Sequence, residues 1–317
     1  MYQRADRQVR HHITMKSCKD TFYRHNFFES QPVENIFDLK DSRAYQAWRE
    51  QKLTNQPRVL EQIVTISNPA DLTFDERKKI LDLCNVANLA IYSSEKIFNK
   101  KNVMEFASQL NLIGADRPLF VGDHGVSEIT QIKGKPQSSF VPYSNKPMSW
   151  HTDGYYNPSG SEVFGFILHC ECPASTGGET ALLDPEIVYL QLRDLNPEYI
   201  EALMQPDVFE VDANIKDGKI IRPAQRGSVF SVVNGNLFMR FSGRKRFIKW
   251  KSGLAVERAK KALEEVLEDK SHFGIYYTLS SGEGVVCNNV LHSRSAFNDS
   301  DKFKRRYYRA RFKSRIS

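Results

Sequence analysis

The sequence predicts a mainly β fold with flanking helices, arranged as a β sandwich or barrel. Short apolar runs separated by turn residues recur after about residue 160, helical segments lie between them, and no regular strand–helix–strand alternation appears. The 317 residues are 40% hydrophobic and 11% aromatic, which is enough to bury a substantial core. Length alone suggests two domains, but β sandwiches and barrels of this size also form one.

The chain divides into an N-terminal arm and one large domain. Residues 1–57 are polar, carry scattered aromatic residues and lack a clean periodicity. We expect an irregular arm there, or a pair of short helices that packs on the core. Residues 58–317 are expected to form a single domain, without internal repeats or low-complexity tracts.

The domain opens with a helix, a strand and a second helix. Residues 72–84 have the apolar stripe of a helix, with Thr73 as N-cap and Glu76 at the capping-box position. Residues 86–92 are typical of a buried strand, and residues 101–112 of another short helix.

Strands dominate from residue 161 onward. Residues 163–170 form an almost continuous apolar run, as expected of a core strand. Asn234-Gly235 predicts a hairpin between strands 229–233 and 237–241. The remaining elements are predicted as helices 185–192, 197–204 and 256–267 and strands 273–279, 284–287 and 305–312.

The net charge of +7 and the isoelectric point near 9.0 allow binding to nucleic acid or to an acidic substrate. The basic residues are scattered, however, and the densest run, 302–315, carries the regular aromatic positions of a strand. Nucleic acid is therefore not an expected partner.

Cysteine usage and hydropathy favour a cytoplasmic protein. The five cysteines are odd in number and lack the spacing of a disulfide scaffold, which indicates free thiols in a reducing compartment. No apolar run is long enough to cross a bilayer, and residues 1–7 lack the apolar core of a secretory signal. An organelle-targeting segment is the alternative for this arginine-bearing N-terminus.

His151 and Asp153 are the candidate metal ligands that stand closest together. On an extended segment, residues two apart share one face, so an imidazole and a carboxylate point the same way. A distant histidine, His292, would complete a facial triad for Fe(II), a metal that suits mixed nitrogen and oxygen ligands. Taken alone, such a pair also occurs on surface turns.

The wider pattern is more specific than the pair. Residues 173–180, which end in Gly-Gly-Glu-Thr, follow the pair, and His292 precedes an arginine-rich strand. In this order the motifs resemble the taurine dioxygenase-like family of Fe(II)/2-oxoglutarate oxygenases over roughly residues 70–313. The resemblance implies a double-stranded β-helix (a cupin-like jelly roll), Fe(II) as cofactor, 2-oxoglutarate as co-substrate, and molecular oxygen with a small molecule as substrates.

The resemblance also implies how 2-oxoglutarate is held. An arginine some 14 positions after the distal histidine binds the distal carboxylate in the family, and here that position is Arg306. Arg305 and Arg306 face opposite ways on a strand, so only one enters the pocket, and we expect Arg306, with Arg305 and Arg309 on the other face. Thr180 is expected to donate its hydroxyl to the same carboxylate.

Two further details bear on the chemistry. Related iron halogenases resemble this pattern but replace the acid by a small residue, so Asp153 favours hydroxylation or oxidative cleavage. Many relatives carry an Asp-Asn pair five or six positions before the distal histidine, whereas Asn288-Asn289 lies closer to His292. The loop that leads to His292 is therefore expected to be shorter.

The substrate is less readable. The residues that could contact it follow the metal pair or lie between the ligands: Tyr155, Tyr156, Asn157, Arg222, Arg240, Arg244 and Arg246. The resemblance admits an amino acid, sulfonate, betaine or related carboxylate. The alternative is a cupin-like metal-dependent isomerase or hydrolase that does not use 2-oxoglutarate, and the sequence predicts no oligomeric state.

Overall fold

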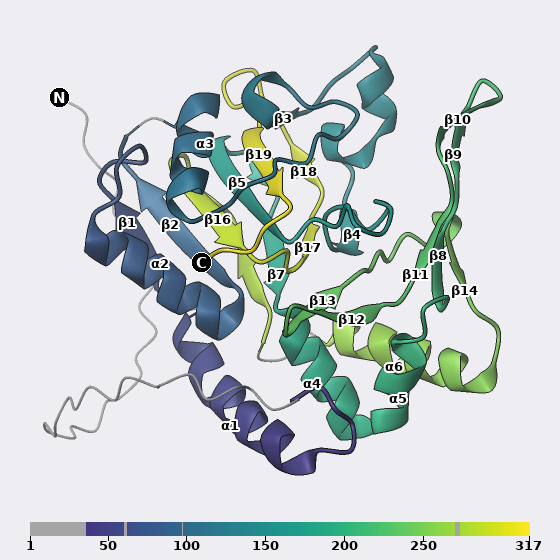
Figure 1. Cartoon of the computed structure of the whole chain (residues 1–317). Helices are drawn as coiled ribbons and strands as arrows, with labels where there is room; N and C mark the ends of the chain where they lie inside the picture. Colours follow the sequence, from purple (N-terminus) through teal and green to yellow (C-terminus); the bar gives the residue numbers. More distant parts are fainter. Residues whose placement is uncertain (1–35, 60–61, 97, 270–272) are drawn as a thin grey trace, which may run out of the picture. The chain divides into compact units, whose positions relative to one another are not determined.

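Two β-sheets face one another at the centre of the described part of the chain, which in this computed structural model is residues 36–317 without 60–61, 97 and 270–272 (Figure 1). The larger sheet has the strand order β1 (Ile63–Ile66), β2 (Leu89–Ser94), β16 (Glu283–Cys287), β5 (Gly165–Cys172), β19 (Arg306–Phe312) and β3 (Ser127–Thr130). The smaller sheet has the order β15 (Ile275–Tyr277), β7 (Thr180–Leu183), β17 (Leu291–Arg294) and β4 (Met148–His151). The short strands β6 (Thr176–Gly177) and β18 (Phe297–Asn298) pair beside them.

Apolar side chains of both sheets fill the space between them. Phe166 and Val285 of the larger sheet pack in one buried cluster with Leu182 and Ile275 of the smaller. Strands that are neighbours in the sequence can lie in opposite sheets, as β15 and β16 do. The predicted mainly β fold is confirmed, and each strand that was predicted from residue 163 onward is found close to its predicted position, beside further short strands that were not predicted.

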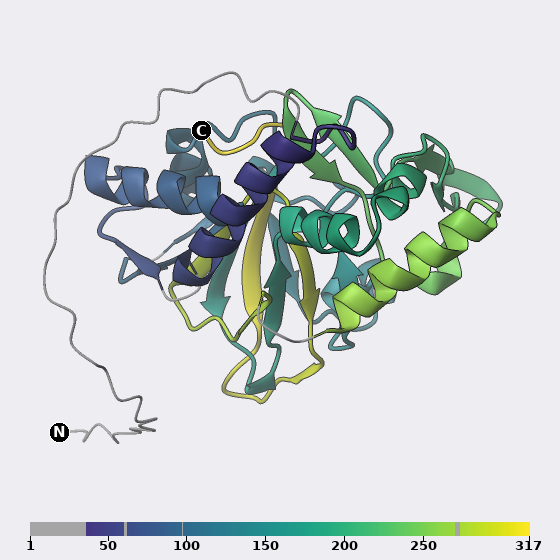
Figure 2. The ribbon, with the colours of Figure 1, turned by 90° about the horizontal axis from the view of Figure 1, so that it is seen from below.

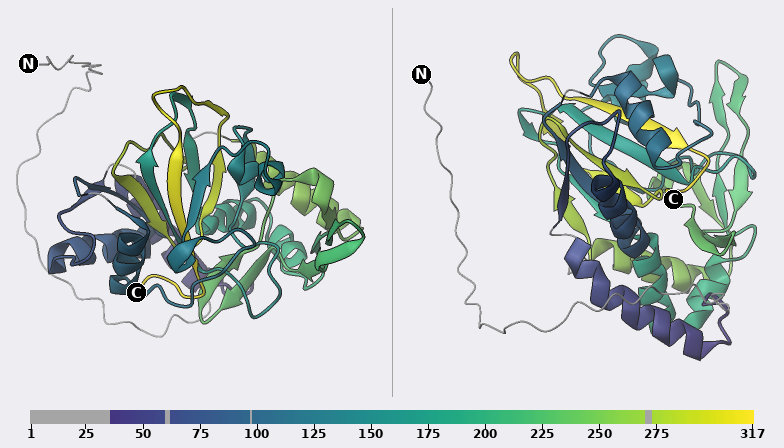
Figure 3. Two further views of the ribbon diagram at one scale, coloured as in Figure 1. Left: turned by 90° about the horizontal axis from the view of Figure 1, so that it is seen from above. Right: turned by 60° about the vertical axis from the view of Figure 1, so that its left-hand side comes forward.

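Helices α2 (Phe74–Ala87) and α3 (Lys100–Gln109) cover the outer face of the larger sheet (Figure 3). Their buried residues, among them Ile80 and Phe106, pack against Ile167 and Phe312 of the sheet. The predicted capping box is present in α2: Thr73 accepts a hydrogen bond from the Glu76 amide, and the Glu76 side chain accepts one from the Thr73 amide.

Four helices pack together in a second cluster (Figure 2): α1 (Ser42–Val59), α4 (Pro185–Leu195), α5 (Pro197–Leu203) and α6 (Leu254–Glu268). In the described part of the expected N-terminal arm, α1 packs on the core as one long helix, where an irregular arm or a pair of short helices was expected. Tertiary contacts explain it, because Trp48 packs edge-on against Tyr189, and Lys52 is buried in an ion pair with Asp184 at 2.6 Å. Residues 1–35 lie outside the described part.

The segment of residues 209–250, which lies between the predicted ligands, forms small sheets of its own. Its three-stranded sheet and the β9–β10 hairpin stand to one side of the central sheets (Figures 1 and 3). The strands of the whole segment are β8 (Phe209–Val211), β9 (Asn214–Lys216), β10 (Lys219–Arg222), β11 (Gln225–Gly227), β12 (Phe230–Val233), β13 (Asn236–Met239) and β14 (Ile248–Trp250). The predicted hairpin at Asn234-Gly235 is confirmed as β12–β13, whereas β8 to β11 are short and were not predicted.

Short 3-10 helices complete the described elements at Asp123–Gly125, Pro136–Ser139, Val141–Tyr143 and Lys245–Phe247. Among the described helices, none combines the length and the apolar character that a bilayer span requires.

The capping box of α2 is open to a direct test. Replacing Thr73 by Ala removes the side-chain acceptor of the first turn and should lower the free energy of unfolding by about 1 kcal/mol. Urea denaturation followed by circular dichroism measures the change. Lys79→Ala, at an exposed position of the same helix, is the control and should change stability little; an equal loss in both variants would contradict the role of the cap.

Candidate metal centre

Strand pairing brings the two predicted histidine ligands together. His151 ends β4 and lies directly opposite His292 of β17 in the antiparallel ladder. The centroids of their rings are 4.1 Å apart. His151, Asp153 and His292 are all buried, and each offers a ligand atom within 4.8 Å of the others. The three residues predicted from the sequence therefore meet in one cluster.

Both imidazoles are oriented by backbone carbonyls. His151 Nδ1 donates to Ser149 O at 2.9 Å, and His292 Nδ1 donates to Val290 O at 3.0 Å. Because a carbonyl only accepts, the hydrogen of each neutral ring resides on Nδ1 and the lone pair on Nε2. Each histidine thus presents an unprotonated nitrogen, the state that a metal requires.

Asp153 is held as a carboxylate by two arginines. Arg309 Nη1 donates to its Oδ1 at 3.0 Å, and Arg311 Nη1 lies 3.6 Å from the same oxygen. Burial alone would raise the pKa of Asp153, but the positive charges of Arg309 and Arg311 outweigh it and hold the pKa below its usual range. Oδ2 is buried and has no hydrogen-bond partner among the described residues, so it remains available to a cation.

These donors fit Fe(II). Burial, and then the neighbouring His292, lowers the pKa of His151 to about 3, and burial also lowers the pKa of His292. Two neutral imidazoles and one carboxylate form the mixed nitrogen and oxygen set of a non-haem iron site, with open positions left for other ligands.

Asn289 fixes the segment that carries Asp153. Its side-chain oxygen accepts from the Asp153 amide at 2.8 Å, and its Nδ2 donates to Asp153 O at 3.0 Å and Val163 O at 2.6 Å. Asn289 has a left-handed φ of 50°, which asparagine tolerates better than most residues. Asn289, three positions before His292, therefore holds the segment of Asp153 beside the segment of His292.

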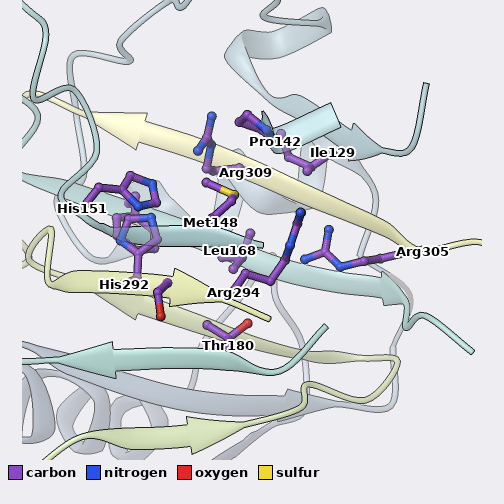
Figure 4. Close-up of a pocket in the computed structure, with 12 residues that line it drawn as sticks. Ile129, Pro142, Met148, His151, Leu168, Thr180, His292, Arg294, Arg305 and Arg309 are labelled. Atoms are coloured by element: carbon purple, nitrogen blue, oxygen red, sulfur yellow. The ribbon is translucent and has the colours of Figure 1, made fainter. Parts of the chain in front are cut away.

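A pocket opens beside the two imidazoles and contains three arginines (Figure 4). His151 and His292 lie at one end, and Arg294 and Arg305 at the other. The lining residues are Ile129, Pro142, Met148, His151, Phe166, Leu168, Thr180, His292, Ser293, Arg294, Arg305 and Arg309.

Arg294 and Arg305 are buried, with incompletely used donors. The Nε of each, and Nη1 of Arg305, lack a hydrogen-bond partner within the described part of the chain. Burial, and then the charge of Arg305, lowers the pKa of Arg294 to about 9. A buried surplus of positive charge with free donors is the environment that a carboxylate-bearing ligand would satisfy.

Arg306 does not enter this pocket. Its side chain is 44% exposed, and its Nε pairs with Glu171 Oε2 at 2.8 Å on the opposite face of β19. The face of β19 that is turned toward the pocket and Asp153 instead carries Arg305, Arg309 and Arg311, because residues an even number of positions apart share one face of a strand. Only one of the adjacent pair faces the pocket, as expected, but it is Arg305.

The other predicted residues divide between the pocket and the surface. Thr180 is buried, lines the pocket and lies across the ladder from Arg294. Tyr155 packs at right angles to His151, with ring centroids 6.4 Å apart. Arg244 and Arg246 are exposed and lie over Phe247.

Comparison with known proteins agrees with this geometry. The family model described as taurine catabolism dioxygenase TauD, TfdA family matches residues 24–311. The chain belongs to this family. It is accordingly a non-haem Fe(II)/2-oxoglutarate-dependent dioxygenase, which confirms the prediction made from the sequence.

Two curated relatives are similar over part of their length. A uridine-5'-phosphate dioxygenase of a Streptomyces species is 27% identical over 191 residues, which is 57% of this chain and 68% of the relative. One of an Amycolatopsis species is 27% identical over 166 residues, which is 51% of this chain and 59% of the relative.

Solved structures confirm the cupin-like double-stranded β-helix. Asparagine oxygenase bound to Fe(II), 3-hydroxyasparagine and succinate has a TM-score of 0.56 at 13% identity, covering 84% of this chain and 91% of that one. The oxygenase OrfP bound to Fe and α-ketoglutaric acid has a TM-score of 0.58 at 16% identity, covering 84% and 90%. A Burkholderia xenovorans taurine dioxygenase has a TM-score of 0.53 at 17% identity, covering 79% and 88%.

Sequence reasoning missed two contributors to the centre. Arg311 was not singled out, although it is 2% exposed and also pairs with Asp116. Asn289 was noted only for its spacing. Period-two alternation from Arg305 would have pointed to Arg311, but no local signal reports that Asn289 contacts the Asp153 backbone, since 136 positions separate them.

We predict that Asn289 sustains metal affinity. Asn289→Gly keeps the left-handed backbone accessible but removes the clamp on Asp153, and it should weaken Fe(II) binding about 10- to 100-fold. Anaerobic titration calorimetry measures the affinity. Asn288→Ala is the matched control, because Asn288 is also buried but bonds to Asn88 and Ile316; equal affinities in the two variants would refute the clamp.

Proposed function

We propose that His151, Asp153 and His292 are the Fe(II) ligands of this dioxygenase. The observation that supports this most directly is the buried cluster of two Nε2 lone pairs and a carboxylate, one oxygen of which has no hydrogen-bond partner among the described residues. When bound, iron with 2-oxoglutarate and oxygen supplies the oxidising chemistry, which yields succinate and carbon dioxide and hydroxylates the substrate.

We further propose that Arg305 and Thr180 bind the distal carboxylate of 2-oxoglutarate. Arg305 supplies a buried guanidinium with two donors that have no partner in the described part of the chain, and Thr180 supplies a hydroxyl in the same pocket. A guanidinium matches a carboxylate with two parallel hydrogen bonds and stays charged when buried. Arg305 takes the place that the sequence pattern assigned to Arg306.

The other residues of the centre position and shield it. Arg309 and Arg311 keep Asp153 ionised, and the backbone carbonyls of Ser149 and Val290 hold the two imidazoles. The apolar lining of the pocket, including Phe166 and Leu168, limits the access of water to the reacting atoms.

The substrate is a small molecule. We propose that it belongs to the amino acids, sulfonates, betaines or related carboxylates, or to the nucleoside phosphates that the names of the curated relatives suggest. We also propose a cytoplasmic protein that does not bind nucleic acid, on the grounds of scattered basic charge and four free thiols in the described part. Family membership disfavours the alternative of an isomerase or hydrolase.

Turnover without a substrate tests the assignment. Purified protein with Fe(II), ascorbate and 2-oxoglutarate should form succinate slowly, and His151→Ala should abolish this because one metal ligand is lost. Succinate is quantified by chromatography. His124→Asn, at an exposed histidine with a left-handed φ of 59°, is the control. Undiminished succinate formation in His151→Ala would overturn the metal assignment.

The two adjacent arginines provide an internal comparison for the co-substrate. Arg305→Ala should raise the KM for 2-oxoglutarate about 10- to 100-fold, because this factor corresponds to the free energy of a hydrogen bond to a charged group. Arg306→Ala loses only a partly exposed ion pair and should leave that KM nearly unchanged. The reverse pattern in the succinate assay would assign the anchor to Arg306.

A further inference from the structure

A second pair of arginines lies close to the metal cluster without taking part in it. Arg240 follows β13 and is only 7% exposed, and Arg222 ends β10 and is partly buried. Neither lines the pocket that contains Arg294, Arg305 and Arg309. The two guanidinium groups contact adjacent residues of one turn, because Arg240 Nη2 donates to Asn157 O and Arg222 lies over the ring of Tyr156.

Backbone contacts place Arg240 beside the ligand strand. Its Nη2 donates to Asn157 O, in the turn that follows Asp153. The neighbouring Phe241 exchanges hydrogen bonds with Thr152, and Ser242 pairs with His151. The segment that carries Arg240 is therefore attached to the same strand end that carries the predicted metal ligands.

A wall of two tyrosines connects the metal cluster to Arg222. Tyr155 packs against His151, and its ring centroid is 5.1 Å from that of Tyr156. The guanidinium carbon of Arg222 lies 5.6 Å from the Tyr156 ring centroid. A molecule that lies along these rings would reach from the cations to the metal ligands.

The charges of this pair are not balanced by ion pairs. Arg222 donates to Asp212 O and Pro223 O, and Arg240 to Arg226 O and Asn157 O, all of which are neutral carbonyls. Neither arginine forms an ion pair within 4.0 Å in the described part of the chain. Burial lowers the pKa of each guanidinium, while Glu162 near Arg240 and Asp212 near Arg222 act in the opposite direction.

Gly227 leaves space for the side chain of Arg240. A Cβ at Gly227 would lie 2.5 Å from Arg240 Nη1, so the absence of a side chain there leaves room for the guanidinium. Arg226, on the same strand β11, differs in being exposed and paired through Nε with Glu210 at 2.7 Å.

We propose that Arg222 and Arg240, with Tyr155 and Tyr156, form a second anion site that binds the phosphate group of a phosphorylated substrate. This inference rests on the proposed function, because the site is useful only if the adjacent cluster is the oxidising centre. Two guanidinium groups match the charge of a phosphate monoester, which is about −1.5 to −2 at pH 7. A monocarboxylate carries half of that charge, and the ammonium group of an amino acid would be repelled.

Phosphate binding tests the proposal without turnover. Inorganic phosphate is titrated calorimetrically into the anaerobic holoenzyme with Fe(II) and saturating 2-oxoglutarate, which occupies the arginine pocket. Arg222→Ala and Arg240→Lys should each weaken binding about tenfold or more, since lysine keeps the charge but not the planar fork. Arg226→Ala should bind phosphate as the unsubstituted protein does.

A third variant, a competing carboxylate ligand and the succinate assay complete the test. Gly227→Ala displaces the Arg240 guanidinium without removing a charge and should also weaken phosphate binding, and circular dichroism establishes that each variant folds. Undiminished phosphate affinity in folded Arg222→Ala and Arg240→Lys, or equally tight binding of acetate, would overturn the proposal. Phosphate binding that depends on both arginines, in a protein that forms no succinate, would instead leave the anion site standing and overturn the proposed function.

Discussion

The antiparallel pairing of β17 with β4 and β7 is the constraint on which the site depends. This register places His292 opposite His151 on one side and Leu182 on the other, and Arg294 opposite Thr180. Because side chains alternate along a strand, a slip by one residue would turn His292 and Arg294 out of the pocket together. The approach of the two histidines, and the positions of Thr180 and Arg294 in the pocket, therefore depend on one hydrogen-bonded ladder.

The centre holds more buried arginines than carboxylates. Arg294, Arg305, Arg309 and Arg311 are buried or nearly so, and within the described residues Asp153 and Asp116 are the acids that pair with them. Burying unpaired charge is costly, so a protein retains such groups where a ligand completes them. The arginines that hold Asp153 ionised, and those whose donors lack a partner in the described part of the chain, thus form one cluster of buried positive charge, which anionic ligands would offset under the proposed function.

The choice between Arg305 and Arg306 illustrates a limit of sequence reasoning. Alternation established that only one of them enters the pocket, but both faces of β19 are covered. Tyr307 packs between the sheets, whereas Ala310 and Phe312 pack under the helices. With apolar residues on each face, the pattern does not reveal which face is which. An extra residue, Glu171, also interrupts the pairing of β19 with β5 next to Arg306, and such a shift is not visible in a count of positions.

The sequence by itself determined the mainly β fold, the family, the capped helix at Thr73 and the three candidate ligands, because these depend on local periodicity, caps and motifs. Only the tertiary structure decided which arginines face the pocket, that Asn289 clamps the Asp153 segment, and that residues 42–59 form a helix against α4. It also decided that Arg222 lies over the Tyr156 ring and that Arg240 donates to Asn157 O in the same turn. These features depend on contacts between residues far apart in the chain, and such contacts are set by strand register and packing rather than by the residues adjacent in sequence.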